Sequence, residues 1–138
     1  MGSKAILCGE LGDASVVKLI GNTIISFMLE GFCEGLVVAR KNEIPLQTVL
    51  DVVMASGFAS PYFAFKGPAI DKRDFDQHFS IDLLVKDQTL MLEEAAGRRV
   101  PMPGLAAIRE VFQSARAQGL GQEDIGAVIK VLEKAAGV

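Results

Sequence analysis

The chain has 138 residues, of which 50% are hydrophobic and 22% are charged, and this length suits one domain but hardly two. Its apolar content is enough to bury a core and is not that of a disordered chain. Fourteen basic and seventeen acidic residues give a net charge of −3, without the basic surface typical of proteins that bind nucleic acids or anionic membranes. We therefore expect a folded protein with neither kind of partner.

The chain offers few residues for a metal site or a histidine-based site. Cys8 and Cys33 lie far apart without a Cys-X-X-Cys or Cys/His cluster, so neither a zinc site nor a disulfide framework is indicated. The single histidine, His78, lies in a polar stretch and is expected on an exposed loop rather than in catalysis. We therefore expect no metal, and the cysteine usage favours a reducing, cytoplasmic location.

The pattern of apolar residues is helical almost throughout. No run alternates strictly between apolar and polar residues as a strand would, so the sequence predicts an all-α fold of about six helices. Residues 1–8 are interpreted as a cloning remnant and linker, because Gly-Ser directly after the first Met is typical of vector-encoded sequence. Residues 9–138 are expected to form one helical domain.

A long first helix is predicted over about residues 13–41. Asp13 or Ser15 can serve as its N-cap, and Asn42 ends it. Charges interrupt its apolar sequence, so the longest uncharged stretch, residues 19–29, has eleven residues, whereas a membrane span needs about 20. We therefore expect a nearly buried helix of a folded domain rather than a membrane span.

Further segments are predicted to pack against this first helix. Pro45 can begin a second helix, whose apolar side chains recur at three- and four-residue intervals until Ser56 and Gly57 stop it. A short segment over residues 58–66 is rich in aromatic residues, which are expected in the core. The remaining helices are expected over about residues 80–96, 103–118 and 123–135.

Lys18 and Asn22 lie about one helical turn apart within the apolar first helix. The four-residue spacing places both side chains on one face, where an ammonium and an amide can together hold an oxygen-rich small molecule. A lysine that is partly desolvated in an apolar cleft can also exchange protons near neutral pH, as general acid–base catalysis requires. The alternative for Lys18, a side chain that extends along the helix to reach water, is the commoner case.

Lys86 is a second lysine among apolar residues of a predicted helix. Asp82 precedes it by four residues and Asp87 follows it, which favours a surface ion pair. The alternative is anion binding. Phe79, seven residues earlier and expected on the same helical face, can stack against a ring while Lys86 contacts a phosphate, hydroxyl or carboxylate.

Several short motifs, taken in order, resemble one family. They are Gly9-X-X-Gly12, Lys18-X-X-X-Asn22, Glu34, Ile44-Pro45, Ser56-Gly57, Lys66-Gly67-Pro68, Asp74-Phe75, Phe79, Lys86-Asp87 and Val100-Pro101-Met102-Pro103. Their order and spacing resemble the C-terminal helical domain of the β-hydroxyacid dehydrogenases, a domain that is similar to part of 6-phosphogluconate dehydrogenase. The family includes 3-hydroxyisobutyrate dehydrogenases, tartronate semialdehyde reductases and glyoxylate/succinic semialdehyde reductases.

The resemblance implies an NAD(P)-dependent oxidoreductase that interconverts a small hydroxy acid and its semialdehyde or keto form. Lys18 matches the family's catalytic lysine, the general acid/base that exchanges the proton of the substrate hydroxyl, and Asn22 matches a substrate-binding asparagine. Lys86 matches the lysine of a Lys-Asp pair that reaches the cofactor, and Phe79 matches an aromatic position beside it. NAD or NADP is thus the implied cofactor.

Members of this family are much longer than this chain and begin with a Rossmann domain that binds most of the cofactor. The resemblance therefore implies that this chain is the C-terminal half of such an enzyme and is inactive alone. Its implied partners are that N-terminal domain, a small hydroxy acid or semialdehyde substrate, and further copies in a homo-oligomer. A non-catalytic helical oligomerisation module on the same scaffold is the alternative.

Overall fold

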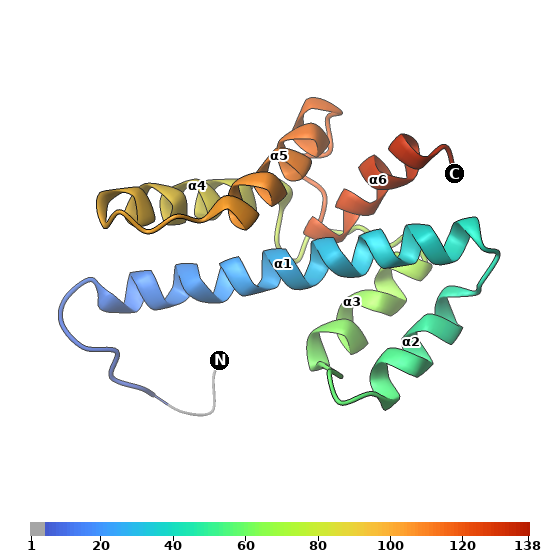
Figure 1. Ribbon diagram of the computed structural model, residues 1–138, viewed down its shortest axis with the longest axis horizontal. Coiled ribbons are helices and arrows are strands. Elements are labelled where there is room, and N and C mark those ends of the chain that lie inside the picture. The colour runs from blue at the N-terminus through green and yellow to red at the C-terminus, as the bar shows by residue number, and fades with distance from the viewer. Residues whose placement is uncertain (1–4) are drawn as a thin grey trace.

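The helices of the chain are arranged along one long helix, α1 (Asp13–Lys41), as the computed structural model in Figure 1 shows. The others are α2 (Leu46–Ala55), α3 (Pro61–Asp71), α4 (Ile81–Gly97), α5 (Pro103–Ala117) and α6 (Ile129–Ala136), and a 3-10 turn, η1 (Ile125–Val128), leads into α6. The structure describes residues 5–138, and this part of the chain contains no strand. The prediction of an all-α fold with about six helices is confirmed.

The ends of α1 follow from local sequence. Gly12 is the N-cap, with a φ of 105° in the left-handed region that favours glycine, and Asn42 ends the helix as predicted. The prediction of Asp13 or Ser15 as the N-cap is wrong, because both already lie within the helix. Asp13 instead accepts a hydrogen bond at Oδ2 from the Glu10 backbone N–H, at 2.8 Å.

The segment before α1 is exposed and not helical where it is described. Residues 1–4 lie outside the described residues, so half of the interpreted cloning remnant over residues 1–8 falls there. That interpretation stays a prediction, as does the assignment of residues 9–138 to one domain.

The core lies around the C-terminal half of α1. Leu29, Cys33, Leu36 and Val37 are buried there and pack with side chains of α4, α5, η1 and α6, among them the fully buried Phe112. In the N-terminal half of α1 the buried residues are polar, namely Thr23 and Ser26. The two halves of the helix therefore differ in how much apolar surface holds them to the domain.

The apolar character of α1 also meets the length and composition of a membrane span. Its most apolar window of 18 residues has a mean hydropathy of 1.5, so the expectation that charges rule out a span is wrong on composition alone. Core helices of folded domains share these properties. Only 22% of this window is buried in the fold, so the prediction of a nearly buried helix is wrong, although α1 does contact α4, α5 and α6 along one side.

The aromatic segment after α2 departs from its prediction. It forms α3, which begins after the N-cap Ser60 and continues through residues 66–68 to Asp71. Phe63 packs within the domain, its ring 4.9 Å from that of Phe32, but Phe58 and Phe65 are exposed. The prediction that the aromatic residues of this segment lie in the core is therefore wrong for Phe58 and Phe65.

The last predicted helix, over residues 123–135, is divided into η1 and α6. Asp124 sets the start of η1, because its Oδ1 accepts a hydrogen bond from the Gly126 backbone N–H at 2.9 Å. The same Oδ1 lies 2.6 Å from Lys66 Nζ of α3, and both side chains are 5% exposed. A buried ion pair therefore fixes α3 to the start of η1.

Candidate functional site

The two candidate residues of α1 meet at one carboxylate of α4. Asp87 Oδ2 accepts a hydrogen bond from Asn22 Nδ2 at 2.6 Å and lies 3.2 Å from Lys18 Nζ. The Asp87 side chain is only 4% exposed, so these polar partners offset the cost of removing its oxygens from water. The structure thus brings Lys18 and Asn22 together, as their four-residue spacing predicts.

Lys86 joins the same group from the neighbouring position on α4. Its Nζ lies 3.9 Å from the other Asp87 oxygen, Oδ1. The predicted ion pair between Lys86 and Asp82 is not formed, because Asp82 accepts hydrogen bonds from Arg116 Nε at 2.6 Å and Gln122 Nε2 at 2.7 Å instead. Lys86 therefore does not pair with Asp82 and lies beside Asp87. We call Lys18, Asn22, Lys86 and Asp87 the Asp87 group.

Both ammonium groups open to solvent. The side chains of Lys18 and Lys86 are 65% and 60% exposed, so residues 5–138 do not themselves build the apolar cleft expected around Lys18. Leu83 and Leu90 lie one turn before and after Lys86 on α4 and are also exposed. The result is an open surface with two cations, one amide and apolar side chains beside them.

Phe79 lies elsewhere than its predicted position. α4 begins at Ile81 with Ser80 as its N-cap, so the expectation that Phe79 and Lys86 share a helical face is wrong. The Phe79 ring is partly buried and packs against the core. The Phe79 backbone N–H donates a hydrogen bond to Asp124 Oδ2 at 3.2 Å. This bond holds the Phe79 backbone in the loop before α4.

Two buried polar residues, Ser26 and Gln88, form a chain of hydrogen bonds to Asn22, and the sequence analysis identified neither of them. The Ser26 hydroxyl donates to the Asn22 carbonyl at 2.9 Å, and Gln88 Nε2 donates to Ser26 Oγ at 3.0 Å. The adjacency of Gln88 to Asp87 and the four-residue spacing of Ser26 from Asn22 are weak sequence signals. The sequence analysis also missed that Asp87 joins α4 to α1, because this role depends on a contact between segments that are distant in the sequence.

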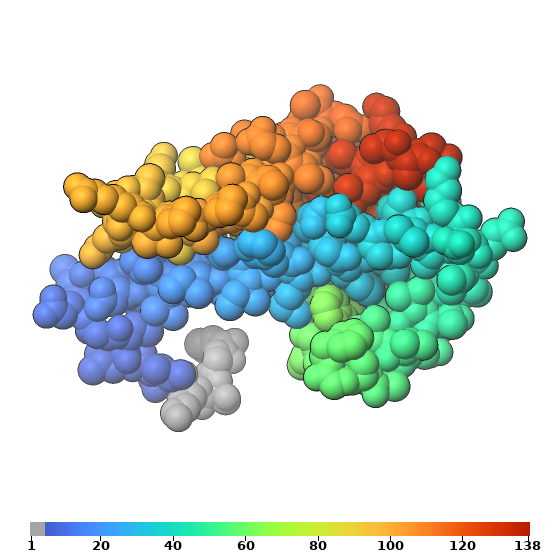
Figure 2. Space-filling model, viewed as in Figure 1, coloured from blue at the N-terminus to red at the C-terminus, as the bar shows by residue number. Residues whose placement is uncertain are grey.

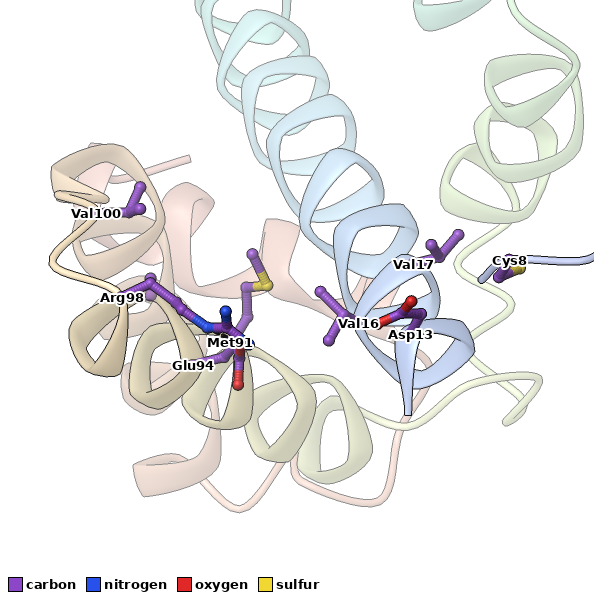
Figure 3. A pocket seen from close by; sticks show the side chains of 9 residues that line it. Cys8, Asp13, Val16, Val17, Met91, Glu94, Arg98 and Val100 are labelled. Carbon is purple, nitrogen blue, oxygen red and sulfur yellow. Dashed lines mark hydrogen bonds and ion pairs between the residues drawn. The ribbon is translucent and has the colours of Figure 1, made fainter. Parts of the chain in front are cut away.

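A shallow pocket of about 440 Å³ lies farther along the seam between α1 and α4. Figure 3 shows Asp13, Val16 and Val17 of α1 on one side, and on the other Met91 and Glu94 of α4 with Arg98, the residue directly after that helix. Arg98 Nε forms an ion pair with Glu94 Oε1 at 3.1 Å. Two of the charged side chains that line this pocket therefore already contact each other. Within residues 5–138, no three His, Cys, Asp or Glu side chains are grouped to hold a metal ion.

Comparison with known proteins identifies the family. The family model for the NAD-binding domain of NADP-dependent 3-hydroxyisobutyrate dehydrogenase matches residues 12–132. The chain belongs to this family. The resemblance to β-hydroxyacid dehydrogenases is thereby confirmed, and the family's description agrees with the expected NAD or NADP.

Relatives of the 3-hydroxyisobutyrate dehydrogenase family extend over nearly all of this chain. It is 35% identical over 133 residues to glyoxylate/succinic semialdehyde reductase 1 of Arabidopsis thaliana, covering 96% of this chain and 46% of that protein. It is 33% identical over 120 residues to the cytokine-like nuclear factor N-PAC of Aedes aegypti, covering 87% of this chain and 22% of that protein. The chain thus spans less than half the length of each.

A solved structure confirms the fold. The crystal structure of 3-hydroxyisobutyrate dehydrogenase from Salmonella typhimurium matches with a TM-score of 0.82 at 30% identity, over 87% of this chain and 42% of that chain. The all-α architecture is therefore that of a helical domain in this family.

The chemistry of the Asp87 group fits a nicotinamide cofactor. Exposed ammonium groups of Lys18 and Lys86 suit phosphate or carboxylate oxygens, and the Asn22 amide offers both a donor and an acceptor. The exposed side chains of Leu83 and Leu90 offer apolar contact to a ring. No residue of this group conflicts with the family's cofactor.

Proposed function

We propose that this chain is the C-terminal half of an NAD(P)-dependent oxidoreductase that interconverts a small hydroxy acid and its semialdehyde or keto form. The observation that carries the proposal is the single Asp87 oxygen that holds both Lys18, at 3.2 Å, and Asn22, at 2.6 Å. A buried carboxylate orients an exposed ammonium beside an amide, which is the arrangement that a general acid/base and a substrate-orienting group need.

Lys18 is the proposed general acid/base. As the neutral amine, its Nζ takes the proton of the substrate hydroxyl during oxidation, and as the ammonium it returns a proton to the carbonyl oxygen during reduction. The nicotinamide, when bound, accepts or supplies the hydride at the substrate carbon that carries this oxygen. Asn22 holds the reacting oxygen of the substrate close to Lys18 Nζ. The ion pair with Asp87 limits the conformations that the Lys18 side chain adopts.

Lys86 and Phe79 are proposed to contact the cofactor. Lys86 offers its exposed ammonium to an anionic oxygen from the same face as Lys18. Phe79 would act from the loop before α4, where Asp124 holds its backbone and contacts with the core hold its ring. The two residues thus approach the cofactor from different elements.

The partners follow from the open surface around Asp87. An N-terminal Rossmann domain would cover this surface, supply most of the cofactor contacts and complete the cleft around Lys18, and we propose that residues 5–138 alone have no turnover. Self-association into a homo-oligomer and a cytoplasmic location belong to the same proposal. These properties concern the longer natural protein in which such a domain precedes this chain.

The decisive experiment replaces Lys18 in the natural protein that contains this chain. Lys18→Ala should lower kcat by a factor of about 10²–10⁴ with glyoxylate or succinic semialdehyde, followed as oxidation of NADPH and NADH. Lys134→Ala, which removes an exposed lysine that donates to Gln118, should leave turnover unchanged. Turnover of the Lys18→Ala protein within about twofold of wild type would reject the assignment.

A non-catalytic oligomerisation module is the second candidate function. The similarity to N-PAC favours it, because the name of that relative states no enzymatic activity. Titration of NADPH and NADH into the natural protein, followed by fluorescence, separates the two candidates. Saturable binding supports the oxidoreductase, whereas self-association without cofactor binding supports the module.

A further inference from the structure

A second pocket, of about 340 Å³, lies at the C-terminal end of α1, between this helix, the end of α3 and α6. Arg40 of α1 lines it and lies about 33 Å beyond Lys18 along the helix axis. Figure 2 shows α6, in red, against the C-terminal part of α1, at the end of the molecule opposite to residues 13–20. We call this pocket the Arg40 pocket, and it is separate from the Asp87 group.

The Arg40 pocket has an apolar lining. Leu36 of α1, Ile70 of α3 and Ile129 of α6 are buried and form its base, and Ile44 and Leu46 line it from the start of the α2 segment. A pocket of several hundred Å³ with apolar walls and a few polar groups is the usual form of a site for a small molecule. The lining therefore suits a small aliphatic group.

Arg40 offers an unused pair of donors at this pocket. Its Nη1 donates to Glu133 Oε1 at 2.5 Å, whereas its Nε and Nη2 donate no hydrogen bond within residues 5–138. The N–H groups of Nε and Nη2 point in parallel, which is the geometry that binds both oxygens of one carboxylate. Arg73 differs, because both of its terminal nitrogens already donate to Glu133, at 2.8 Å and 2.9 Å.

The position of the Arg40 guanidinium is fixed on one side and open on the other. Glu133 is buried on α6 and holds the guanidinium, while more than half of the Arg40 side chain is exposed to solvent. A planar donor group that is already oriented loses less conformational entropy when a carboxylate binds it. Arg40 is therefore a preorganised carboxylate-binding group.

Asp71, the last residue of α3, supplies a carboxylate at the same pocket. It is exposed, and in the part of the chain that the structure describes its side chain neither accepts a hydrogen bond nor forms an ion pair. The formal charges of Asp71 and Glu133 balance those of Arg40 and Arg73. A ligand that carries one positive and one negative group would therefore leave the Arg40 pocket neutral.

We propose that the Arg40 pocket binds a free α-amino acid with an aliphatic side chain. The carboxylate of the ligand binds Nε and Nη2 of Arg40, its ammonium binds Asp71, and its side chain lies on the apolar base. An acid without the ammonium would meet the negative charge of Asp71, and an amine without the carboxylate would leave Arg40 unused. The zwitterion is thus the ligand that satisfies both groups.

Isothermal titration calorimetry of L-leucine into the natural protein that contains this chain tests the proposal. We expect saturable binding with a Kd of about 0.1–1 mM, the range for so small a ligand. Three analogues each lack one of the recognised groups. They are 4-methylpentanoate without the ammonium, 3-methylbutylamine without the carboxylate, and glycine without the side chain, and each should bind at least about tenfold more weakly.

Two variants make the matching changes in the protein. Arg40→Gln and Asp71→Asn alter exposed side chains, so both should fold with unchanged circular dichroism, and each should raise the Kd of L-leucine at least about tenfold. Arg98→Gln and Asp76→Asn remove exposed charges elsewhere and should keep the wild-type Kd. Asp71→Asn should bind 4-methylpentanoate at least as tightly as wild type does, because the repelling carboxylate is absent.

Three results would overturn the proposal. They are the absence of saturable binding up to about 20 mM L-leucine, a Kd within about twofold of wild type in both Arg40→Gln and Asp71→Asn, and loss of binding in Lys18→Ala. The last result would move the ligand to the Asp87 group. Because the calorimetry measures no turnover, failure of the Arg40 pocket and failure of the proposed oxidoreductase function are read from separate measurements.

Discussion

Asn22 Nδ2 and Asp87 Oδ2 lie 2.6 Å apart, although 65 residues separate them in the chain. The same oxygen lies 3.2 Å from Lys18 Nζ, so one buried atom of α4 sets the positions of two side chains of α1. Any change in how α4 packs on α1 is thus passed directly to the proposed general acid/base.

Asp87→Asn tests this role as a positioning residue. The substitution keeps the volume but removes the charge that holds Lys18, and a displacement of about 1 Å at a catalytic group can cost about 10²-fold in rate. We expect kcat of the natural protein to fall about 10²-fold, with a smaller change in KM and an altered pH profile of kcat. Asp76→Asn, at an exposed site, is the control, and an unchanged kcat and pH profile in Asp87→Asn would contradict the role.

The buried ion pair of Lys66 and Asp124 should contribute strongly to stability. Lys66→Met leaves the Asp124 carboxylate buried without its cation, and breaking such a pair costs about 3–5 kcal/mol. Urea unfolding followed by far-UV circular dichroism measures the change in the free energy of unfolding. Arg98→Ala, which removes an exposed ion pair with Glu94, should cost less than about 1 kcal/mol, and a similarly small cost for Lys66→Met would be inconsistent with this account.

Gly67 permits the close approach of α3 to α2. A Cβ at this position would lie 2.3 Å from Leu50 Cδ2, so Gly67→Ala should destabilise the fold by about 1–3 kcal/mol. Leu50→Ala in the same chain should relieve the overlap, which makes the double variant more stable than the sum of the two single changes predicts. Thermal unfolding provides the comparison, with Gly97→Ala as the control because a Cβ there meets nothing within 4 Å.

Glu30 should make stability depend on pH. Burial, together with the charge of Glu34 and a hydrogen bond to it, raises the pKa of Glu30 from 4.5 to about 6. Between these values the folded state binds more protons than the unfolded state, so stability falls as pH rises through about 6.

Glu30→Gln should therefore raise the free energy of unfolding by about 1 kcal/mol at pH 7, after allowance for solvent screening, and by almost nothing below pH 4.5. Urea titrations at the two pH values measure the difference. The same effect of the substitution at both pH values would show that ionisation of Glu30 does not destabilise the fold.

The parts of the fold that were predicted correctly depend on near neighbours in sequence. Asn42 ends α1 as predicted, although the N-cap proved to be Gly12, and the three- and four-residue apolar spacing marks α2 without reference to other segments. The error at Phe65 has a different origin. Its exposure is decided by which side of α3 the domain covers, and a composition rule for aromatic residues does not contain that information.

The candidate site divides in the same way. The common face of Lys18 and Asn22 follows from helical spacing, but their shared partner, Asp87, becomes visible only when α4 is packed on α1. The position of Phe79 was misjudged because Asp124, 45 residues later, holds its backbone outside the helix. Sequence spacing therefore identifies which residues can act together, and long-range packing decides which carboxylate joins them.

The uneven burial of α1 has a consequence for motion. Local opening of a helix costs least where few apolar contacts must be broken, so the N-terminal half, whose buried residues are Thr23 and Ser26, opens more readily than the half that carries Leu29 and Cys33. Lys18 and Asn22 stand on the readily opening half. The groups proposed for chemistry can thus shift to fit a ligand while the remainder of the same helix keeps the domain folded.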